Sequence, residues 1–186
     1  MNGNASLTQK GYLKKVLQKF NINDDTKSVS TPLCPHFKLK GTISPITIEE
    51  REYMTHVPYA SAVGSLMYIM VCTRSDLSQV ISIVSRYMHN PRRGHWEAVK
   101  WIFRYIKGTI DIGLVLKKDV TGKQECIGYV DFDYAGDVDK CRSTTRYVFT
   151  LSQVPVSWRS TLQSIIALST TKAEYMAMIE AMKKAI

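Results

Sequence analysis

The segment at residues 128–139 reads Gly128-Tyr129-Val130-Asp131-Phe132-Asp133-Tyr134-Ala135-Gly136-Asp137-Val138-Asp139. Together with Cys126 and Ile127, its first part is rich in β-branched and aromatic residues, which is typical of a strand over 126–131. Four carboxylates crowd the point where this strand is expected to end. Such like charges repel one another, and a cation such as Mg²⁺ would relieve the repulsion. Because Asp is also a common turn residue, an exposed acidic loop is the alternative interpretation.

The residues around this segment predict more strands and one helix. Short runs of strand-forming residues lie at Ile112–Leu116, Tyr147–Leu151 and Val154–Trp158. Near the C-terminus, Ser169 or Thr170 is expected to cap a helix with a face of mostly small residues. That face consists of Ala173, Met176, Ala177 and Ala181.

The N-terminal half has a helical pattern instead. Apolar residues recur at helical spacing from Leu7 to Phe20 and in three later segments. These segments are Val63–Met70, Leu77–Val84 and Trp96–Ile106. We expect Ser75 to cap the second segment and Gly108 to end the third in a left-handed turn. Residues 21–45 contain three prolines and few periodic apolar residues, which predicts a linker or an extended loop.

The predicted fold class is therefore α+β, with a helical region at residues 1–118 followed by antiparallel strands and one long helix at residues 119–186. The net charge of +9 comes from the first region, which contains 17 Lys and Arg residues and 8 Asp and Glu residues. This excess of positive charge has two equally good explanations: a nucleic-acid partner, or basic faces that are simply solvated.

The spacing of cysteines and histidines argues against a disulfide-stabilised protein and against a zinc-binding protein. The four cysteines and four histidines form neither a disulfide framework nor a zinc-ligand cluster. The first thirty residues contain lysines at positions 10, 14, 15 and 19 and no uninterrupted apolar core, so they predict neither a signal peptide nor a membrane anchor. We expect a cytoplasmic or nuclear protein with no membrane partner.

Glu174 lies in a second informative segment, Ala167-Leu168-Ser169-Thr170-Thr171-Lys172-Ala173-Glu174-Tyr175-Met176-Ala177. This segment and residues 128–139 closely resemble the ribonuclease H domain of copia-type retrotransposon Pol polyproteins, as do Arg142-Ser143-Thr144-Thr145 and Val156-Ser157-Trp158. Four upstream segments resemble the connection between reverse transcriptase and that domain. They are Ser30-Thr31-Pro32-Leu33, Tyr59–Tyr68, Thr73-Arg74-Ser75-Asp76 and His95-Trp96-Glu97-Ala98-Val99-Lys100.

The resemblance implies a ribonuclease H-like fold in residues 119–186, with Asp131 and Glu174 as catalytic carboxylates and Mg²⁺ ligands. In the family, two metal ions support cleavage of the RNA strand of an RNA/DNA hybrid. The third carboxylate of the family belongs to a later strand, beyond Ile186. We therefore expect a truncated domain, weak or absent Mg²⁺ binding and no catalysis by the isolated chain. Asp133, Asp137 and Asp139 share one loop and are not expected to substitute.

Two positions depart from the family pattern. Lys172 replaces a residue that is usually acidic, and it is expected to face away from Glu174. Arg146 replaces a usual Gly, and strain in the second strand is expected if that position needs a bulge or a positive φ. The missing later strands would also leave one edge of the strand at 126–131 bare, where a protein partner could pair.

Three functions are compatible with these features. The first, which we favour, is an inactive Pol fragment that binds RNA/DNA hybrids or other nucleic acid through its basic half. The second is a non-catalytic interaction module, similar to proteins labelled secreted RxLR effectors that suppress host cell death, although no Arg-x-Leu-Arg sequence is present. The third is a nuclease completed by another polypeptide that supplies the missing strands and carboxylates.

Overall fold

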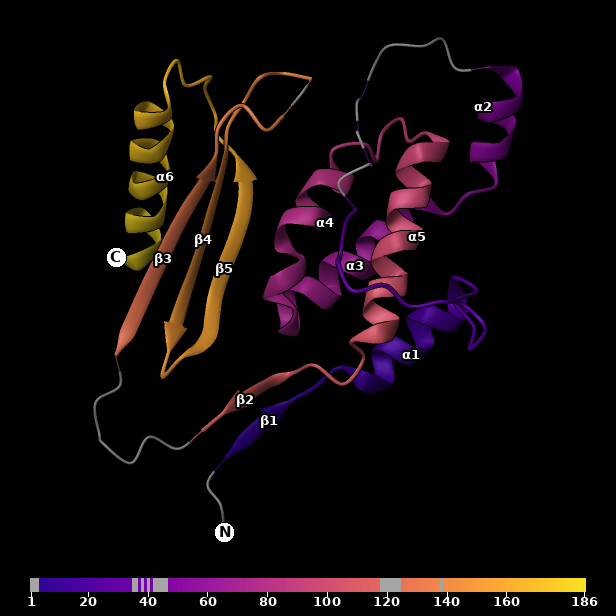
Figure 1. The fold of residues 1–186 in the computed structure, drawn as a ribbon, viewed down its shortest axis with the longest axis horizontal. Helices are drawn as coiled ribbons and strands as arrows, with labels where there is room; N and C mark the ends of the chain where they lie inside the picture. The colour runs from indigo at the N-terminus through magenta and orange to yellow at the C-terminus, as the bar shows by residue number, and fades with distance from the viewer. Residues whose placement is uncertain are drawn as a thin grey trace. The chain divides into compact units, whose positions relative to one another are not determined.

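The computed structural model describes residues 4–34, 37, 39, 41, 47–117, 125–137 and 139–186. It contains two compact units, one formed by Thr8–Gly113 and the other by Met1–Leu7 with Leu114–Ile186. The fold is mixed α and β, as expected, with helices in both units and two antiparallel sheets in the second (Figure 1). In the described part of the chain, no helix combines the length and the apolar character needed to cross a membrane.

The unit Thr8–Gly113 is helical. Its elements are α1 (Lys10–Lys19), α2 (Ile48–Thr55), α3 (Tyr59–Thr73), the 3₁₀ turn η1 (Ser75–Leu77), α4 (Ser78–Ser85) and α5 (Arg93–Gly108). The apolar stripes expected from helical spacing form one buried core, which confirms the four predicted helical segments except at Leu7, which lies before α1. Core residues include Leu13, Val16, Val63, Leu66, Ile81, Val84, Val99, Ile102, Phe103 and Ile106.

Three details of this unit differ from expectation. Ser75 begins a 3₁₀ turn, and no side chain caps α4. Gly108 is the last helical residue rather than a left-handed stop, and a Cβ there would lie 3.1 Å from the Cβ atom of Ser28. Helix α2 was not predicted, although Thr47 caps it by accepting a hydrogen bond from the Glu50 amide at 3.1 Å.

Residues 23–31 form a loop along α5 that begins with a turn, in which the Thr26 amide donates to the Asn23 carbonyl at 2.9 Å. The Lys107 ammonium group donates to the carbonyl oxygens of Asn23, Asp24 and Thr26 at 2.7–2.8 Å. Arg104 Nε donates to the Lys27 carbonyl at 2.7 Å, and Trp101 Nε1 donates to that of Thr31 at 2.9 Å. This part of segment 21–45 is therefore an ordered loop; residues 35–36, 38, 40 and 42–46 lie outside the described residues.

The other unit contains both sheets. Strand β1 (Ala5–Leu7) pairs with β2 (Leu114–Leu116), so only the second part of the strand expected at Ile112–Leu116 forms. Strands β3 (Cys126–Asp133), β4 (Thr144–Leu151) and β5 (Val154–Leu162) form an antiparallel sheet in that order and confirm the three remaining strand predictions. Ser152 and Gln153 connect β4 to β5 with φ values of 48° and 65°.

Helix α6 (Thr170–Ala185) packs against β3 and β4. Ser169 caps it by accepting a hydrogen bond from the Lys172 amide, as predicted. The small side chains of Ala173, Ala177 and Ala181 are buried and let the helix lie close to the sheet. This spacing of four residues places all three on one helical face, so the expected alanine face is the packing face of α6.

Candidate functional site

Asp131 lies on β3, directly opposite Arg146 on β4. Its Oδ2 atom is 2.7 Å from Nη2 of Arg146, and its Oδ1 atom accepts a hydrogen bond from the Phe132 amide at 2.8 Å. Directly opposed residues in an antiparallel pair place their side chains on the same face, which explains the ion pair. The carboxylate remains 67% exposed while the Arg146 side chain is 28% exposed.

Arg146 does not strain β4, so the expectation of strain at this position was wrong. The residue pairs in regular register with Asp131 on one side and Ser160 on the other. It is absent from the residues with positive φ, and the irregularity in this sheet falls between Phe149 and Thr150. An extended backbone accepts any side chain, so Arg fits at this position without a bulge.

Glu174 is exposed on α6, which covers the opposite face of the sheet from Asp131. Two hydrogen bonds define the covered face, because Gln163 Nε2 donates both to Thr145 Oγ1 at 3.2 Å and to the Ala173 carbonyl at 2.8 Å. Thr145 pairs with Phe132, and side chains alternate along a strand. Thr145 therefore faces α6, whereas Asp131 and Arg146 occupy the other face.

The acidic loop after β3 organises its own backbone. Asp137 is buried, its amide donates to the Arg142 carbonyl at 3.0 Å, and its Oδ1 atom accepts from the Asp139 amide at 3.3 Å. The Asp133 carboxylate lies against Gly136, so a Cβ there would require the Asp133 side chain to move. These geometries are those of turn residues, which favours the loop interpretation of this segment.

The residues present do not fit a two-ion metal centre. Asp131 is occupied by a guanidinium group, and Glu174 belongs to a helix on the other sheet face. Within the described residues, no group of three or more His, Cys, Asp or Glu side chains is arranged to hold a metal ion. The four cysteines, all in that part of the chain, are free thiols.

The segment Thr73-Arg74-Ser75-Asp76 forms a polar cluster in the helical unit. Arg74 is fully buried and donates from Nε and Nη2 to the two carboxylate oxygens of Asp76 at 2.9 and 2.8 Å. It also donates to the backbone and side-chain oxygens of Thr109 at 3.2 and 2.8 Å. The Tyr105 hydroxyl donates to Asp76 at 3.0 Å. This cluster joins the start of η1 to the end of α5.

The electrostatics of the cluster follow from these contacts. Burial by itself raises the pKa of Asp76, but the charge and hydrogen bonds of Arg74, with the bond from Tyr105, outweigh it and hold that pKa below its usual value. Burial and the neighbouring Asp76 carboxylate raise the pKa of Tyr105. Asp76 is therefore a structural counterion of Arg74.

Comparisons with known proteins identify the origin of the chain. It is 49% identical over 182 residues to the Retrovirus-related Pol polyprotein from transposon TNT 1-94 of Nicotiana tabacum, a match that covers 97% of this chain. It is 38% identical over 172 residues to the Pol polyprotein from transposon RE2 of Arabidopsis thaliana, covering 91% of this chain. The chain belongs to the copia-type retrotransposon Pol family.

This Pol-family chain corresponds to a small part of its larger relatives. It spans 13% of the tobacco polyprotein and 11% of the RE2 polyprotein. It is also 45% identical over 133 residues to Secreted RxLR effector protein 161 of Plasmopara viticola, a match that covers 72% of this chain and 92% of that protein. No family model and no solved structure matches the chain.

Proposed function

We propose that this chain is a Pol-derived segment related to ribonuclease H that binds nucleic acid and does not cleave it alone. Relatedness to Pol polyproteins over nearly the whole chain supports this origin. The antiparallel sheet of β3, β4 and β5 with α6 packed on it is compatible with the beginning of a ribonuclease H-like fold. In that fold Asp131 and Glu174 correspond to two of the catalytic carboxylates.

The ion pair between Asp131 and Arg146 carries the proposal that the isolated chain is inactive. Carboxylates at a metal-dependent phosphodiesterase centre must remain available to cations. Here the fixed positive charge of Arg146 satisfies one Asp131 oxygen. A metal ion approaching Asp131 would have to displace this guanidinium group or bind beside it against charge repulsion. Both alternatives disfavour divalent cation binding.

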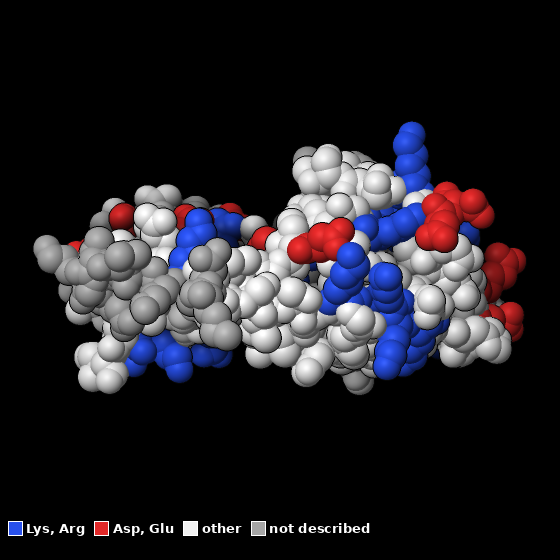
Figure 2. Space-filling model, turned by 90° about the horizontal axis from the view of Figure 1, so that it is seen from below, with Lys and Arg blue, Asp and Glu red and all other residues white. Residues whose placement is uncertain are grey.

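The positive charge of the chain supports binding to a polyanion. The formal net charge is +9, and all of the excess comes from residues 1–118. Figure 2 shows Lys and Arg side chains gathered in several groups on the face that it presents, with Asp and Glu side chains beside some of them. Phosphate neutralisation by such groups releases counterions and is independent of base sequence.

An assay with a labelled RNA/DNA hybrid tests both parts of the proposal. The purified chain should bind the hybrid at low salt, lose affinity as salt rises, and leave the RNA strand intact with Mg²⁺ or Mn²⁺. The Asp131→Asn variant should likewise leave the RNA strand intact, because Asp131 has no catalytic task there. Metal-dependent cleavage that Asp131→Asn abolishes would overturn the proposal of inactivity.

A titration with Mn²⁺ tests the role assigned to Arg146. Freeing the carboxylate in Arg146→Gly should increase Mn²⁺ binding, measured from the electron paramagnetic resonance signal of the unbound ion. The double variant Asp131→Asn/Arg146→Gly should lose that increase. Equal Mn²⁺ binding by the parent chain and Arg146→Gly would show that the ion pair does not control access to Asp131.

A non-catalytic interaction module is the second candidate function. The supporting observation is that most of an oomycete protein named as a secreted RxLR effector aligns with this chain. Exposed apolar side chains on α6, including Tyr175, Met178 and Met182, provide a surface for a protein partner. Failure of the parent chain to bind the hybrid even at low salt would favour this candidate over the first.

A further inference from the structure

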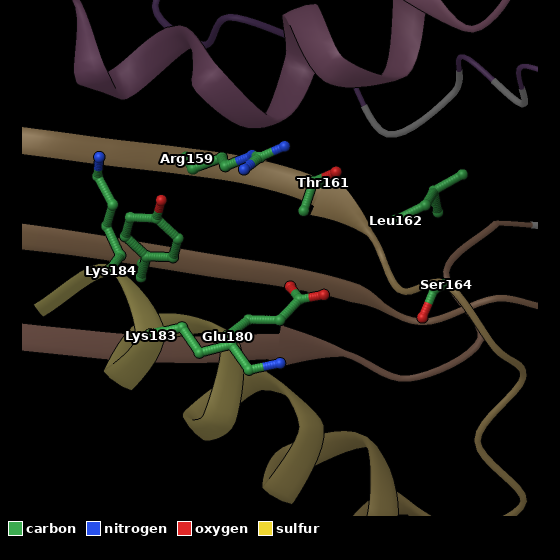
Figure 3. Close-up of a pocket in the computed structure, with 8 residues that line it drawn as sticks. Arg159, Thr161, Leu162, Ser164, Glu180, Lys183 and Lys184 are labelled. Carbon is green, nitrogen blue, oxygen red and sulfur yellow. The ribbon is translucent and has the colours of Figure 1, made fainter. Parts of the chain in front are cut away.

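The sheet face covered by α6 is left partly open beside β5. Helix α6 packs on β3 and β4, and a groove of about 460 Å³ remains between the C-terminal half of α6 and strand β5. Figure 3 shows Arg159 and Thr161 on β5 across this groove from Glu180, Lys183 and Lys184 on α6. The complete lining is Tyr147, Arg159, Thr161, Leu162, Ser164, Glu180, Lys183 and Lys184.

Three cations from two different elements converge on this groove. Arg159 comes from β5, and Lys183 and Lys184 come from the last turn of α6. Among the described residues none of the three forms an ion pair, and Glu180 is the single acidic side chain of the lining. A face of this kind has a positive potential, because walls of low dielectric concentrate the field of unneutralised charges.

The other polar groups match the needs of a phosphate ester. Thr161 and Ser164 place hydroxyl donors on the same groove, and a guanidinium group binds phosphate oxygens in a bidentate manner. The charges are spread over both walls, so an extended polyanion contacts more of them than a single small anion does. The aromatic residue of the lining, Tyr147, is buried, so bases have no exposed ring to stack on.

We propose that the groove between β5 and α6 binds backbone phosphates of a nucleic-acid strand without reading its sequence. The inference rests on the proposed nucleic-acid binding and goes further by placing contacts in the unit that contains Leu114–Ile186, here called the C-terminal unit. The overall charge excess, in contrast, lies in residues 1–118. Arg159, Lys183 and Lys184 contact phosphate oxygens, and Thr161 and Ser164 add neutral donors.

The test compares two variants with the same loss of charge in the same unit. The groove variant is Arg159→Ala/Lys183→Ala/Lys184→Ala, and the control is Lys117→Ala/Lys140→Ala/Lys172→Ala. The control lysines are exposed, lie outside the groove lining and come from the same unit. Fluorescence anisotropy measures binding of a labelled RNA/DNA hybrid over a range of salt concentrations, and circular dichroism verifies that each variant is folded.

The groove variant should bind at least tenfold more weakly than the control. The slope of log K against log salt concentration should also fall by about 2 to 3, because about 0.9 counterions are released per neutralised phosphate. Equal losses in the two variants would refute the groove as a binding site while leaving nucleic-acid binding intact. No binding by the parent chain would instead refute the proposed function, and the groove proposal with it.

A competition experiment identifies the source of the phosphate group. Inorganic phosphate, added at the same phosphate concentration as an unlabelled hybrid competitor, should displace far less labelled hybrid, because it contacts one cation cluster rather than several positions along a strand. Equal displacement by the two competitors would show that the groove binds free phosphate ions and would overturn the assignment to a nucleic-acid strand.

Discussion

Asp76→Asn should destabilise the helical unit because it removes the charge that neutralises a completely buried arginine. Arg74 directs two of its four hydrogen bonds to the Asp76 carboxylate and two to Thr109. Breaking a buried ion pair typically costs about 3–5 kcal/mol, since the remaining charge stays desolvated. The Asp76 side chain is 37% exposed, so water reaches the pair and we expect about 2–3 kcal/mol, below the fully buried range.

Thermal unfolding followed by far-UV circular dichroism measures this loss at neutral pH. For a unit of this size the expected decrease in Tm is roughly 8–15 °C. The matched control is Asp111→Asn in the same unit, where the ion pair with Lys10 is exposed and contributes less than about 1 kcal/mol. Equal decreases in Tm for the two variants would refute the structural role assigned to Asp76.

The pH dependence provides an independent measurement. The folded-state pKa of Asp76 is depressed, so its stabilisation is complete above the unfolded-state pKa of about 3.9 and is lost as pH falls through the lower folded value. The parent chain should therefore lose stability in acid relative to Asp76→Asn, and the difference between their Tm values should shrink below that pH. A constant difference down to strongly acidic pH would contradict this assignment.

Three further substitutions test the local geometry of the C-terminal unit by thermal or urea unfolding. Gly128→Ala places a Cβ 2.6 Å from the Phe149 ring, so it should cost about 1–3 kcal/mol through overpacking; no loss would show that the ring moves aside freely. Gln153→Gly relieves a left-handed conformation in the β4–β5 turn and should stabilise by roughly 1 kcal/mol, and destabilisation would contradict the positive φ. Ser169→Ala removes the cap of α6 and should cost about 1 kcal/mol, whereas an unchanged midpoint would exclude a stabilising cap.

Periodic patterns in the sequence were sufficient for the larger elements. Four helical segments and the three strands of the main sheet form where spacing and residue type predict them. The helices bury their apolar faces in one core, whereas most residues of β3 remain exposed. Strand β1 could not be predicted, since three residues acquire strand structure only by pairing with β2, more than a hundred positions later. Helix α2 carries a signal that was missed, a Thr47 cap followed by Glu50.

The candidate site shows what a pattern cannot provide. The resemblance singles out Asp131 and Glu174, yet the partner of Asp131 depends on the register of β3 and β4, which is not visible in either segment alone. The groove was missed for a similar reason, because Arg159 and Lys183 lie far apart in the sequence and converge only when α6 packs on the sheet. The signal available beforehand was a pair of lysines at the end of a predicted helix.

The pairing of β1 with β2 makes the helical unit an insertion between two paired strands. Leu7 and Leu114 are direct partners in the ladder, so the chain leaves and re-enters the C-terminal unit at adjacent positions. A tight turn joining these two residues would therefore close an ordinary β-hairpin in place of residues 8–113. The same topology gives the helical unit a single pair of junctions with the rest of the chain, between Leu7 and Thr8 and between Gly113 and Leu114.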